Sequence, residues 1–307
     1  MLAIFLQTLP FFAVIGVGYW AGRTGFFTEE ATAYLTKFVF YFALSAMLFR
    51  FSANLTLSEV WDTRLVVAYL WGTAFTYGIA TIVGFLRGLD VATNAVEAQC
   101  ACIGNTGFLG IPMLTLLLGP EAAGPIILSL AVDLIIFSSL IVILITGSRE
   151  GAISWGIFRT IGLGLLKNPM IVAMAAGFAW SGFAIPTPAP LNDFLAILGG
   201  AATPGALFAI GASLASKSAE RMTIAGWLSF CKLVLHPALV ALAMVIFAVD
   251  PYKAGVLIAA AALPVAGNIY ILAQHYGVAP SRVSAAILVS TAISIATVSL
   301  VVAWVAT

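Results

Sequence analysis

The sequence predicts an all-α membrane protein whose ten transmembrane helices form two inverted repeats of five. Three observations lead to this fold class. The chain has 307 residues, of which 62% are hydrophobic and 8% are charged, and a soluble domain cannot bury so much apolar surface. Its apolar residues fall into ten runs, most of them near the ~20 residues that cross a bilayer. Glycine and proline interrupt two of these runs, at corresponding places in the two halves.

The ten predicted spans follow the apolar runs in chain order. No basic segment or cleavage site precedes the first run, so this run is expected to stay in the protein rather than be removed as a signal peptide. The predicted spans are 2–20, 34–51, 65–86, 94–118, 122–146, 169–186, 190–214, 225–248, 254–276 and 281–305.

Lysine and arginine predict the orientation, because they gather on the cytoplasmic side of a membrane. Most lie in or near the loops that follow odd-numbered spans, and Lys232 falls within a span. Both termini are therefore predicted to be extracytoplasmic, in a plasma membrane or a bacterial inner membrane. The charges assigned to the cytoplasmic side are Arg23, Lys37, Arg87, Arg149, Arg159, Lys167, Lys217, Arg221 and Arg282, and those on the opposite side are Arg50, Arg64 and Lys253.

The longest connection divides the chain into a first five-helix repeat (1–146), a cytoplasmic linker (147–168) and a second five-helix repeat (169–307). Apolar residues recur in the linker at helical spacing, which predicts an amphipathic helix on the inner membrane surface. This helix would also serve simply to join the two halves. The recurring residues are Trp155, Phe158, Ile161 and Leu165.

A shift of 159 positions lays the second half of the chain on the first. It places Pro10 on Pro169, Gly18 on Gly177, and Asn105 on Pro264. Each half then holds five spans, and an odd number forces the second copy to enter the membrane the other way up. The sequence therefore predicts an inverted repeat, a common plan among membrane transporters.

The two interrupted spans are the fourth and the ninth. Glycine weakens a helix and proline removes a hydrogen bond, and freed backbone groups survive at membrane depth only inside protein or beside a watery cavity. The half-helix that starts after each break presents free N–H groups and a positive dipole end, which suit a carboxylate. The predicted substrate-binding residues are Asn105, Thr106, Gly107, Gly110 and Pro112 in the first break, and Pro264, Val265, Ala266, Gly267 and Asn268 in the second. The alternative is that these residues only stabilise their own kinks.

Four ionisable residues within or near spans are candidates for ion or proton coupling. Asp133, halfway along the fifth span, would carry a proton or ligate sodium, or else be a buried structural carboxylate paired with Lys232. Lys232 and His236 lie one turn apart; they would bind an anion or relay a proton, or brace the kink at Pro237. Glu97, near the start of the fourth span, would lie in the substrate path or in the headgroup layer.

These features resemble the auxin efflux carrier family of membrane transporters over the whole chain. The most specific matching segments are 105–112, 203–208 with Gly211, 262–264 and 273–277, together with Lys232 and Pro237. One departure is Ser45, which stands where the family often has a proline in the second span. The linker also lacks the long hydrophilic insert of many plant members.

The resemblance implies a fold shared with bile-acid and sodium/proton carriers. In that fold spans 1, 2, 6 and 7 form a scaffold, and spans 3–5 and 8–10 form a moving domain in which helices 4 and 9 cross. The resemblance further implies a homodimer that transports organic anions, which are auxin in plants and small dicarboxylates in bacteria. Gly18 and Gly22 form a helix-pairing motif that would suit a dimer contact.

The predicted function is secondary active transport of a small organic anion by an elevator type of alternating access, coupled to H⁺ or Na⁺ and without a cofactor or metal. The alternatives are a sodium/proton exchanger, a sodium-coupled carrier of another solute, and a membrane anion sensor. An enzyme is not expected, because Gly211-x-Ser213 lacks the closing glycine of a nucleophile elbow. The net charge of +1 gives no reason to expect nucleic acid as a partner; the expected partners are the anion, the lipid bilayer and a second copy.

Overall fold

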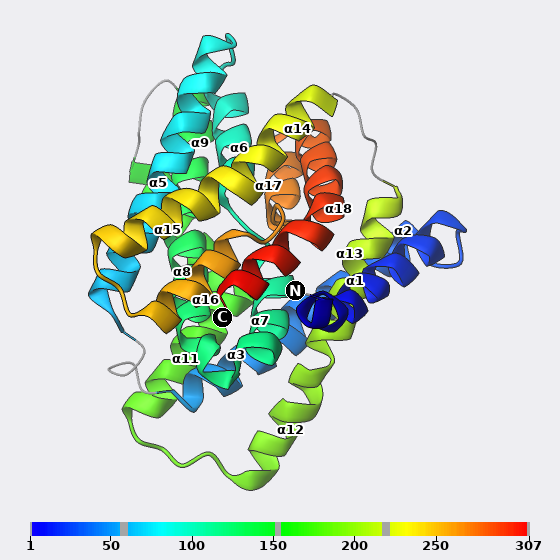
Figure 1. Ribbon diagram of the computed structural model, residues 1–307, viewed down its shortest axis with the longest axis vertical. Helices are drawn as coiled ribbons and strands as arrows, with labels where there is room; N and C mark the ends of the chain where they lie inside the picture. The colour runs from blue at the N-terminus through cyan, green and yellow to red at the C-terminus, as the bar shows by residue number, and fades with distance from the viewer. Residues whose placement is uncertain (1, 56–60, 151–154, 217–221, 306–307) are drawn as a thin grey trace.

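The computed structural model describes residues 2–55, 61–150, 155–216 and 222–305. In these ranges the regular structure is helical, apart from one isolated bridge between two backbone segments. The all-α prediction is therefore confirmed for the described residues (Figure 1). Residues 151–154 of the predicted linker, and the charges Lys217 and Arg221, lie outside the described residues.

The helices are α1 (Leu2–Arg23), α2 (Glu29–Phe38), α3 (Leu44–Ala53), α5 (Thr63–Leu86), α6 (Val91–Cys102), α7 (Ile111–Leu118), α8 (Ala123–Val132), α9 (Ser138–Glu150), α10 (Trp155–Lys167), α11 (Pro169–Gly182), α12 (Ala189–Gly200), α13 (Ala202–Ala215), α14 (Met222–Phe230), α15 (His236–Ile246), α16 (Pro251–Ala261), α17 (Asn268–Tyr276) and α18 (Pro280–Val305).

Six of the described helical stretches are long and apolar enough to cross a membrane, or seven if α10 and α11 count as one span across their 69° bend. This supports a multi-pass membrane protein. The number ten stays a prediction, since the first, fourth and ninth predicted spans are not among these stretches. The six stretches are Glu29–Ala53, Thr63–Leu86, Pro120–Arg149, Ala189–Ala215, Met222–Ile246 and Pro280–Val305.

Several predicted boundaries differ from the structure by a few residues. The second span was predicted to start at 34, but α2 starts at Glu29. The fifth span was predicted to end at 146, but α9 continues to Glu150. The sixth was predicted to reach 186, but α11 ends at Gly182. Two prolines, Pro186 and Pro188, follow α11 closely, and proline disfavours helical backbone in the residue before it. The apolar run therefore extends beyond the helix that it predicted.

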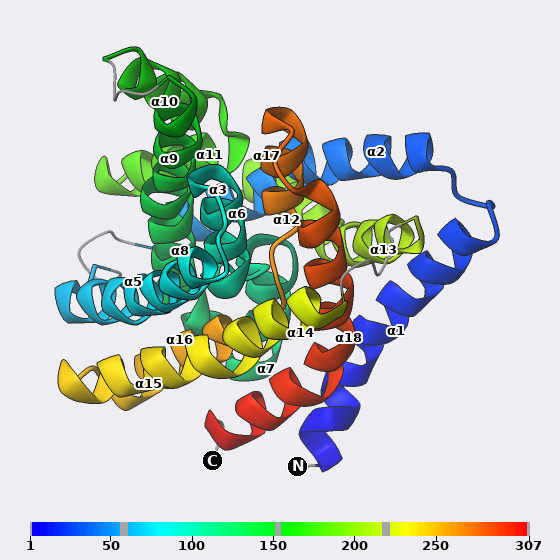
Figure 2. The same ribbon diagram turned by 90° about the horizontal axis from the view of Figure 1, so that it is seen from above.

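The helices pack in two groups. In the first, α1 and α2 pack on α13, and α3 packs on α11 and α12. In the second, α5 packs on α6 and α15, while α18 packs on α14 and α16. Figure 2 shows α1, α2 and α13 together on one side of the molecule and α5 and α15 together on the opposite side. The contacts between the groups are fewer; the largest sets join α1 to α18, and α13 to the segment Thr106–Gly110.

Glycines allow the closest helix contacts of the first group. A side chain at Gly211 of α13 would overlap the backbone of Ile15 in α1, and one at Gly18 would overlap the backbone of Phe208. The α3–α11 contact is similar, because a Cβ at Gly177 would lie 2.7 Å from the carbonyl oxygen of Phe49. Small residues allow such close approach between membrane helices.

The Gly18 motif therefore has a different role from the predicted one. Gly18 and Gly22 both face α13 of the same chain, so their packing is internal and does not provide a dimer contact. The motif was read correctly as a close helix contact, but a sequence pattern of two glycines does not identify the partner helix.

In the described part of the chain, four segments are wider than an α-helix and have π-helical geometry: Val39–Ala43, Thr106–Gly110, Asp133–Phe137 and Cys231–Leu235. The first interrupts the predicted second span between α2 and α3. There the Ser45 hydroxyl donates to the carbonyl oxygen of Phe40 at 3.1 Å. The second span is thus perturbed without the proline that the resembling family often has at position 45.

Candidate functional site

The two breaks predicted from glycine and proline lie against each other. The chain leaves the helical path after α6 and after α16, and the two extended segments form an antiparallel bridge between Gly104 and Val265. Next to this bridge, the Asn105 N–H donates to the carbonyl oxygen of Pro264 at 2.8 Å. Each break therefore satisfies backbone groups that the other has freed, which is necessary at membrane depth.

The register of this pairing places Asn105 opposite Pro264. Asn105 and Pro264 are the pair that the 159-residue shift superposes. On the other side of the bridge, the Ala266 N–H donates to the carbonyl oxygen of Ile103 at 3.1 Å. The pairing thus sets one pair of equivalent positions, Asn105 and Pro264, opposite each other, directly beside the bridge between Gly104 and Val265.

Both half-helices that follow the breaks start at this bridge. Before α7, the N–H groups of Leu109 and Gly110 both donate to the carbonyl oxygen of Asn105 at 3.0 Å. The backbone hydrogen bonds among the described residues leave the N–H groups of Gly107 and Asn268 without an acceptor. Unpaired N–H groups at helix starts favour an anion.

The side chains at the bridge are polar and largely enclosed. Asn105 is 7% exposed and Thr106 is 1% exposed. Asn268 is half-buried, and its Oδ1 is enclosed without a hydrogen-bond partner among the described groups. Gly267, which precedes it, is exposed. The place where the two broken helices meet, called the crossing below, is therefore accessible from the side of α17 and closed around Thr106.

The remaining predicted substrate-binding residues lie at different distances from the bridge. Gly107 faces Met170 of α11, and a Cβ at Gly110 would lie 2.6 Å from Leu263. Pro112 is buried in the first turn of α7 and takes no part in the bridge. The structure thus brings the two predicted segments together at residues 103–110 and 263–268.

Asp133 and Lys232, the two charged residues predicted deep in spans, are both buried, at 2% and 0% exposure. Each lies in a π-helical segment, a feature that is frequent at functional sites. The proposed pairing between them is not what the structure shows, because no ion pair joins these two described side chains. Asp133 instead accepts the hydroxyl of Tyr69, at 3.1 Å from each carboxylate oxygen.

Lys232 reaches the crossing. A Cβ at Gly104 would lie 3.2 Å from both Cε and Nζ of Lys232, so the side chain runs alongside the bridge. Its Nζ donates to the carbonyl oxygen of Ala261, at the end of α16. It also lies 3.2 Å from Nδ1 of His236, whose Nε2 lies 3.1 Å from the Thr73 hydroxyl. The crossing therefore has a fixed cation, which the pattern of the breaks did not predict.

Glu97 has two arginine partners that the sequence did not predict. Its side chain is buried in α6 and forms ion pairs with Arg87, at 2.7 Å, and with Arg282. A carboxylate with two arginine partners has its charge neutralised in place. This arrangement ties the start of α6 to α5 and α18.

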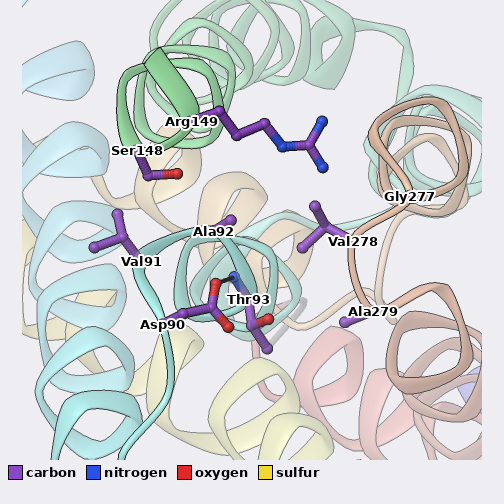
Figure 3. A pocket seen from close by; sticks show the side chains of 9 residues that line it. All are labelled: Asp90, Val91, Ala92, Thr93, Ser148, Arg149, Gly277, Val278 and Ala279. Carbon is purple, nitrogen blue, oxygen red and sulfur yellow. Dashed lines mark hydrogen bonds between the residues drawn. The ribbon is translucent and has the colours of Figure 1, made fainter. Parts of the chain in front are cut away.

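A separate depression of about 630 Å³ lies at the start of α6 (Figure 3). Asp90 caps α6 by accepting the N–H of Thr93, and this bond holds the pKa of Asp90 below its ordinary value. Across the depression, the Arg149 guanidinium donates to the carbonyl oxygen of Tyr276. The depression lies at one end of the second helix group, and none of the predicted site residues lines it.

Sequence reasoning missed Tyr69, Thr73 and Ser290. The Ser290 hydroxyl accepts the N–H of Val265 at 3.1 Å and so supports the bridge from α18. All three are polar residues in strongly apolar helices. A single hydroxyl in a membrane helix most often bonds its own backbone, so the sequence held no signal that distinguished them.

Comparison with known proteins places the chain among membrane transporters. A family model described as "Membrane transport protein" matches residues 3–302. The chain is 31% identical over 299 residues to a "Putative malonate transporter" of Rhizobium meliloti (strain 1021), covering 95% of this chain and 92% of the relative. It is 26% identical over 302 residues to the "Uncharacterized transporter YfdV" of Escherichia coli (strain K12), covering 94% of each chain.

Proposed function

Since the chain belongs to the membrane transport protein family, which includes the auxin efflux carriers, we propose that it is a secondary active carrier of small dicarboxylate anions. The observation that carries this proposal is the antiparallel pairing of the two broken helices at Gly104 and Val265. Discontinuous helices that meet in this way place their positive ends at one site, where anionic groups of a substrate bind.

The proposed architecture is ten spans in two inverted repeats of five. Two observations support it besides the register of the bridge. The 159-residue shift places Gly18 on Gly177 and Phe49 on Phe208. The close contact of Gly18 with Phe208 therefore has an equivalent in the close contact of Gly177 with Phe49. Moreover, the described ends of the chain, in α1 and α18, lie close together in both views (Figures 1 and 2). An even number of crossings returns a chain to the side on which it started.

The proposed movement is of elevator type. The helix group of α1, α2, α3, α11, α12 and α13 would act as the scaffold, and the group that holds the crossing would carry the substrate past it. The sparser packing between the groups than within them supports this division, because an interface that slides must lack the close contacts of a helix core. We further place the protein in the inner or plasma membrane with both termini extracytoplasmic, as a homodimer.

The substrate class follows from the charges at the crossing and from the relatives. The crossing offers unused N–H groups at Gly107 and Asn268, and the ammonium of Lys232 nearby. These are donors and a cation, which suit an anion with carboxylate groups. One relative is named a putative malonate transporter, and malonate is a small dicarboxylate of this kind.

The proposal is tested by uptake into proteoliposomes. Vesicles containing the purified protein are expected to exchange labelled malonate for internal malonate faster than empty vesicles, and unlabelled malonate outside should compete. Saturable malonate binding without any flux would identify a sensor instead of a carrier. The absence of both binding and flux, for malonate and for indole acids, would contradict the substrate class.

Replacing Asn105 with alanine is expected to weaken malonate binding about tenfold, the loss of ~1.4 kcal/mol that one hydrogen bond to a charged group commonly carries. Folding should be retained, because the backbone bond from Asn105 to Pro264 does not need the side chain. Isothermal titration of malonate into the variant checks this, with Asn192→Ala, on the remote α12, as the matched control. Wild-type affinity in Asn105→Ala would remove this side chain from the site.

A further inference from the structure

A cluster of five buried polar side chains lies behind the crossing, within the second helix group. It contains two hydrogen-bonded pieces, Tyr69 with Asp133, and Thr73 with His236 and Lys232. Tyr69 and Thr73 lie one turn apart on α5, and the Thr73 hydroxyl donates to the carbonyl oxygen of Tyr69 at 2.8 Å. Helix α5 thus holds the acidic and the basic residue of the cluster in fixed positions.

The donors and acceptors of the cluster identify which group is able to exchange a proton. A lysine ammonium only donates, so Nδ1 of His236 accepts from Lys232 and its Nε2–H donates to the Thr73 oxygen. The Thr73 hydroxyl in turn donates its hydrogen bond to the carbonyl oxygen of Tyr69. His236 is therefore neutral with both nitrogens engaged. The carboxylate of Asp133 accepts a single hydroxyl and keeps lone pairs free.

The hydrogen bond from Tyr69 to Asp133 favours binding of a proton over binding of a sodium ion at Asp133. The Tyr69 hydroxyl points its hydrogen at both carboxylate oxygens, at 3.1 Å each. A sodium ion needs oxygen lone pairs around it, and a donor hydrogen in its first shell opposes it. The groups that face Asp133 from other helices are Tyr69 of α5, Cys102 of α6 and Lys232 before α15. None adds a second carboxylate.

Charge links this cluster to the crossing. With Asp133 ionised, the cluster has no net charge, because Lys232 balances the carboxylate. With Asp133 protonated, the cluster has a net charge of +1, held by Lys232 beside Gly104. A buried uncompensated cation attracts an anion strongly because little water screens it. Anion binding at the crossing and protonation of Asp133 therefore favour each other.

We propose that this cluster is the proton-coupling site of the carrier. When the dicarboxylate binds beside Lys232, Asp133 takes up one proton from water at a carboxylate oxygen, and it returns the proton when the anion leaves. Tyr69 and Thr73 are positioning residues, which hold Asp133 and Lys232 respectively. This inference rests on the proposed function and adds the identity of the coupled ion.

The test is isothermal titration of potassium malonate into the purified protein, without sodium, at a pH where malonate is fully ionised. Measurements in two buffers of different ionisation enthalpy give the protons taken up for each anion bound. Wild type is expected to take up close to one proton, and Asp133→Asn is expected to bind malonate with none. Asp90→Asn, which replaces one good helix cap by another, is the matched control and should behave as wild type.

Two further variants keep the test decisive if Asp133→Asn does not fold. Tyr69→Phe removes the hydrogen bond that stabilises the carboxylate, so the pH range in which binding takes up a proton should move upward. Thr73→Val should weaken malonate binding, because His236 and Lys232 lose their support, and Thr73→Ser should restore it. A purely structural role for Tyr69 would lower stability and leave the pH range unchanged.

The outcomes separate this inference from the proposed function. Malonate binding by wild type without proton uptake, equal uptake in Asp133→Asn, or binding that requires sodium would each overturn the proton-coupling site while leaving the carrier intact. A wild-type protein that binds no dicarboxylate under any condition would contradict the proposed function itself, and the coupling site with it.

Discussion

Replacing Lys232 with methionine is expected to abolish malonate uptake, with a loss of at least 100-fold in the initial rate. The substitution keeps an unbranched side chain that is one atom shorter, and it removes the cation beside Gly104. It also leaves the carbonyl of Ala261 and Nδ1 of His236 without their donor. Removing one member of a buried charged set commonly costs about 3 kcal/mol of stability, so the melting temperature should fall as well.

A second substitution separates the loss of malonate uptake from the loss of stability. In the double variant Lys232→Met/Asp133→Asn, no uncompensated carboxylate is left, so much of the lost stability should return while uptake stays absent. Lys253→Met is the matched control, because Lys253 forms a half-exposed ion pair with Asp62 at 3.0 Å, and such pairs contribute little. Uptake by Lys232→Met at the wild-type rate would show that the substrate does not depend on this cation.

Replacing Gly211 with alanine is expected to destabilise the protein by about 3 kcal/mol, the upper end for atoms forced into a packed contact. The added methyl group would overlap the backbone of Ile15, so α1 and α13 must move apart along their closest contact. Thermal unfolding in detergent, followed by intrinsic fluorescence, measures the change. A smaller loss is expected for Gly177→Ala, where the neighbouring backbone oxygen is less close.

Gly16→Ala is the matched control for this prediction. Gly16 lies in the same helix, α1, but a Cβ there would meet nothing within 4 Å. Alanine is also the better helix former by roughly 1 kcal/mol. The control should therefore leave the melting temperature unchanged or raise it slightly. Equal destabilisation by both substitutions would contradict the role given to the α1–α13 contact.

The helical membrane fold and the pairing of the breaks were predictable because both depend on strong local signals. Long apolar runs identify helices, and the glycines and prolines at 104–112 and 264–268 mark the breaks. The shift that places Asn105 on Pro264 then indicated which segments belong together, and the structure brings these two residues face to face.

The polar contacts of the site were not predictable in the same way. Asp133 and Lys232 stood out as charges in apolar helices, but their partners, Tyr69 and Ala261, come from helices whose rotation no sequence pattern fixes. Four predicted spans, the second, fourth, fifth and eighth, also contain π-helical segments, which change the side of the helix on which every following residue lies. The ion pairs of Glu97 with Arg87, which directly follows α5, and with Arg282 of α18 were likewise not predictable from the sequence.

The central claim is that the paired breaks form the anion site, and a crystal structure with bromomalonate tests it most directly. The anomalous scattering of bromine locates the ligand independently of the protein. The account predicts a bromine position at the crossing, beside Asn105 and Asn268 and within reach of Lys232. Bromine in the depression lined by Asp90 and Arg149, with the crossing empty at saturating ligand, would contradict it.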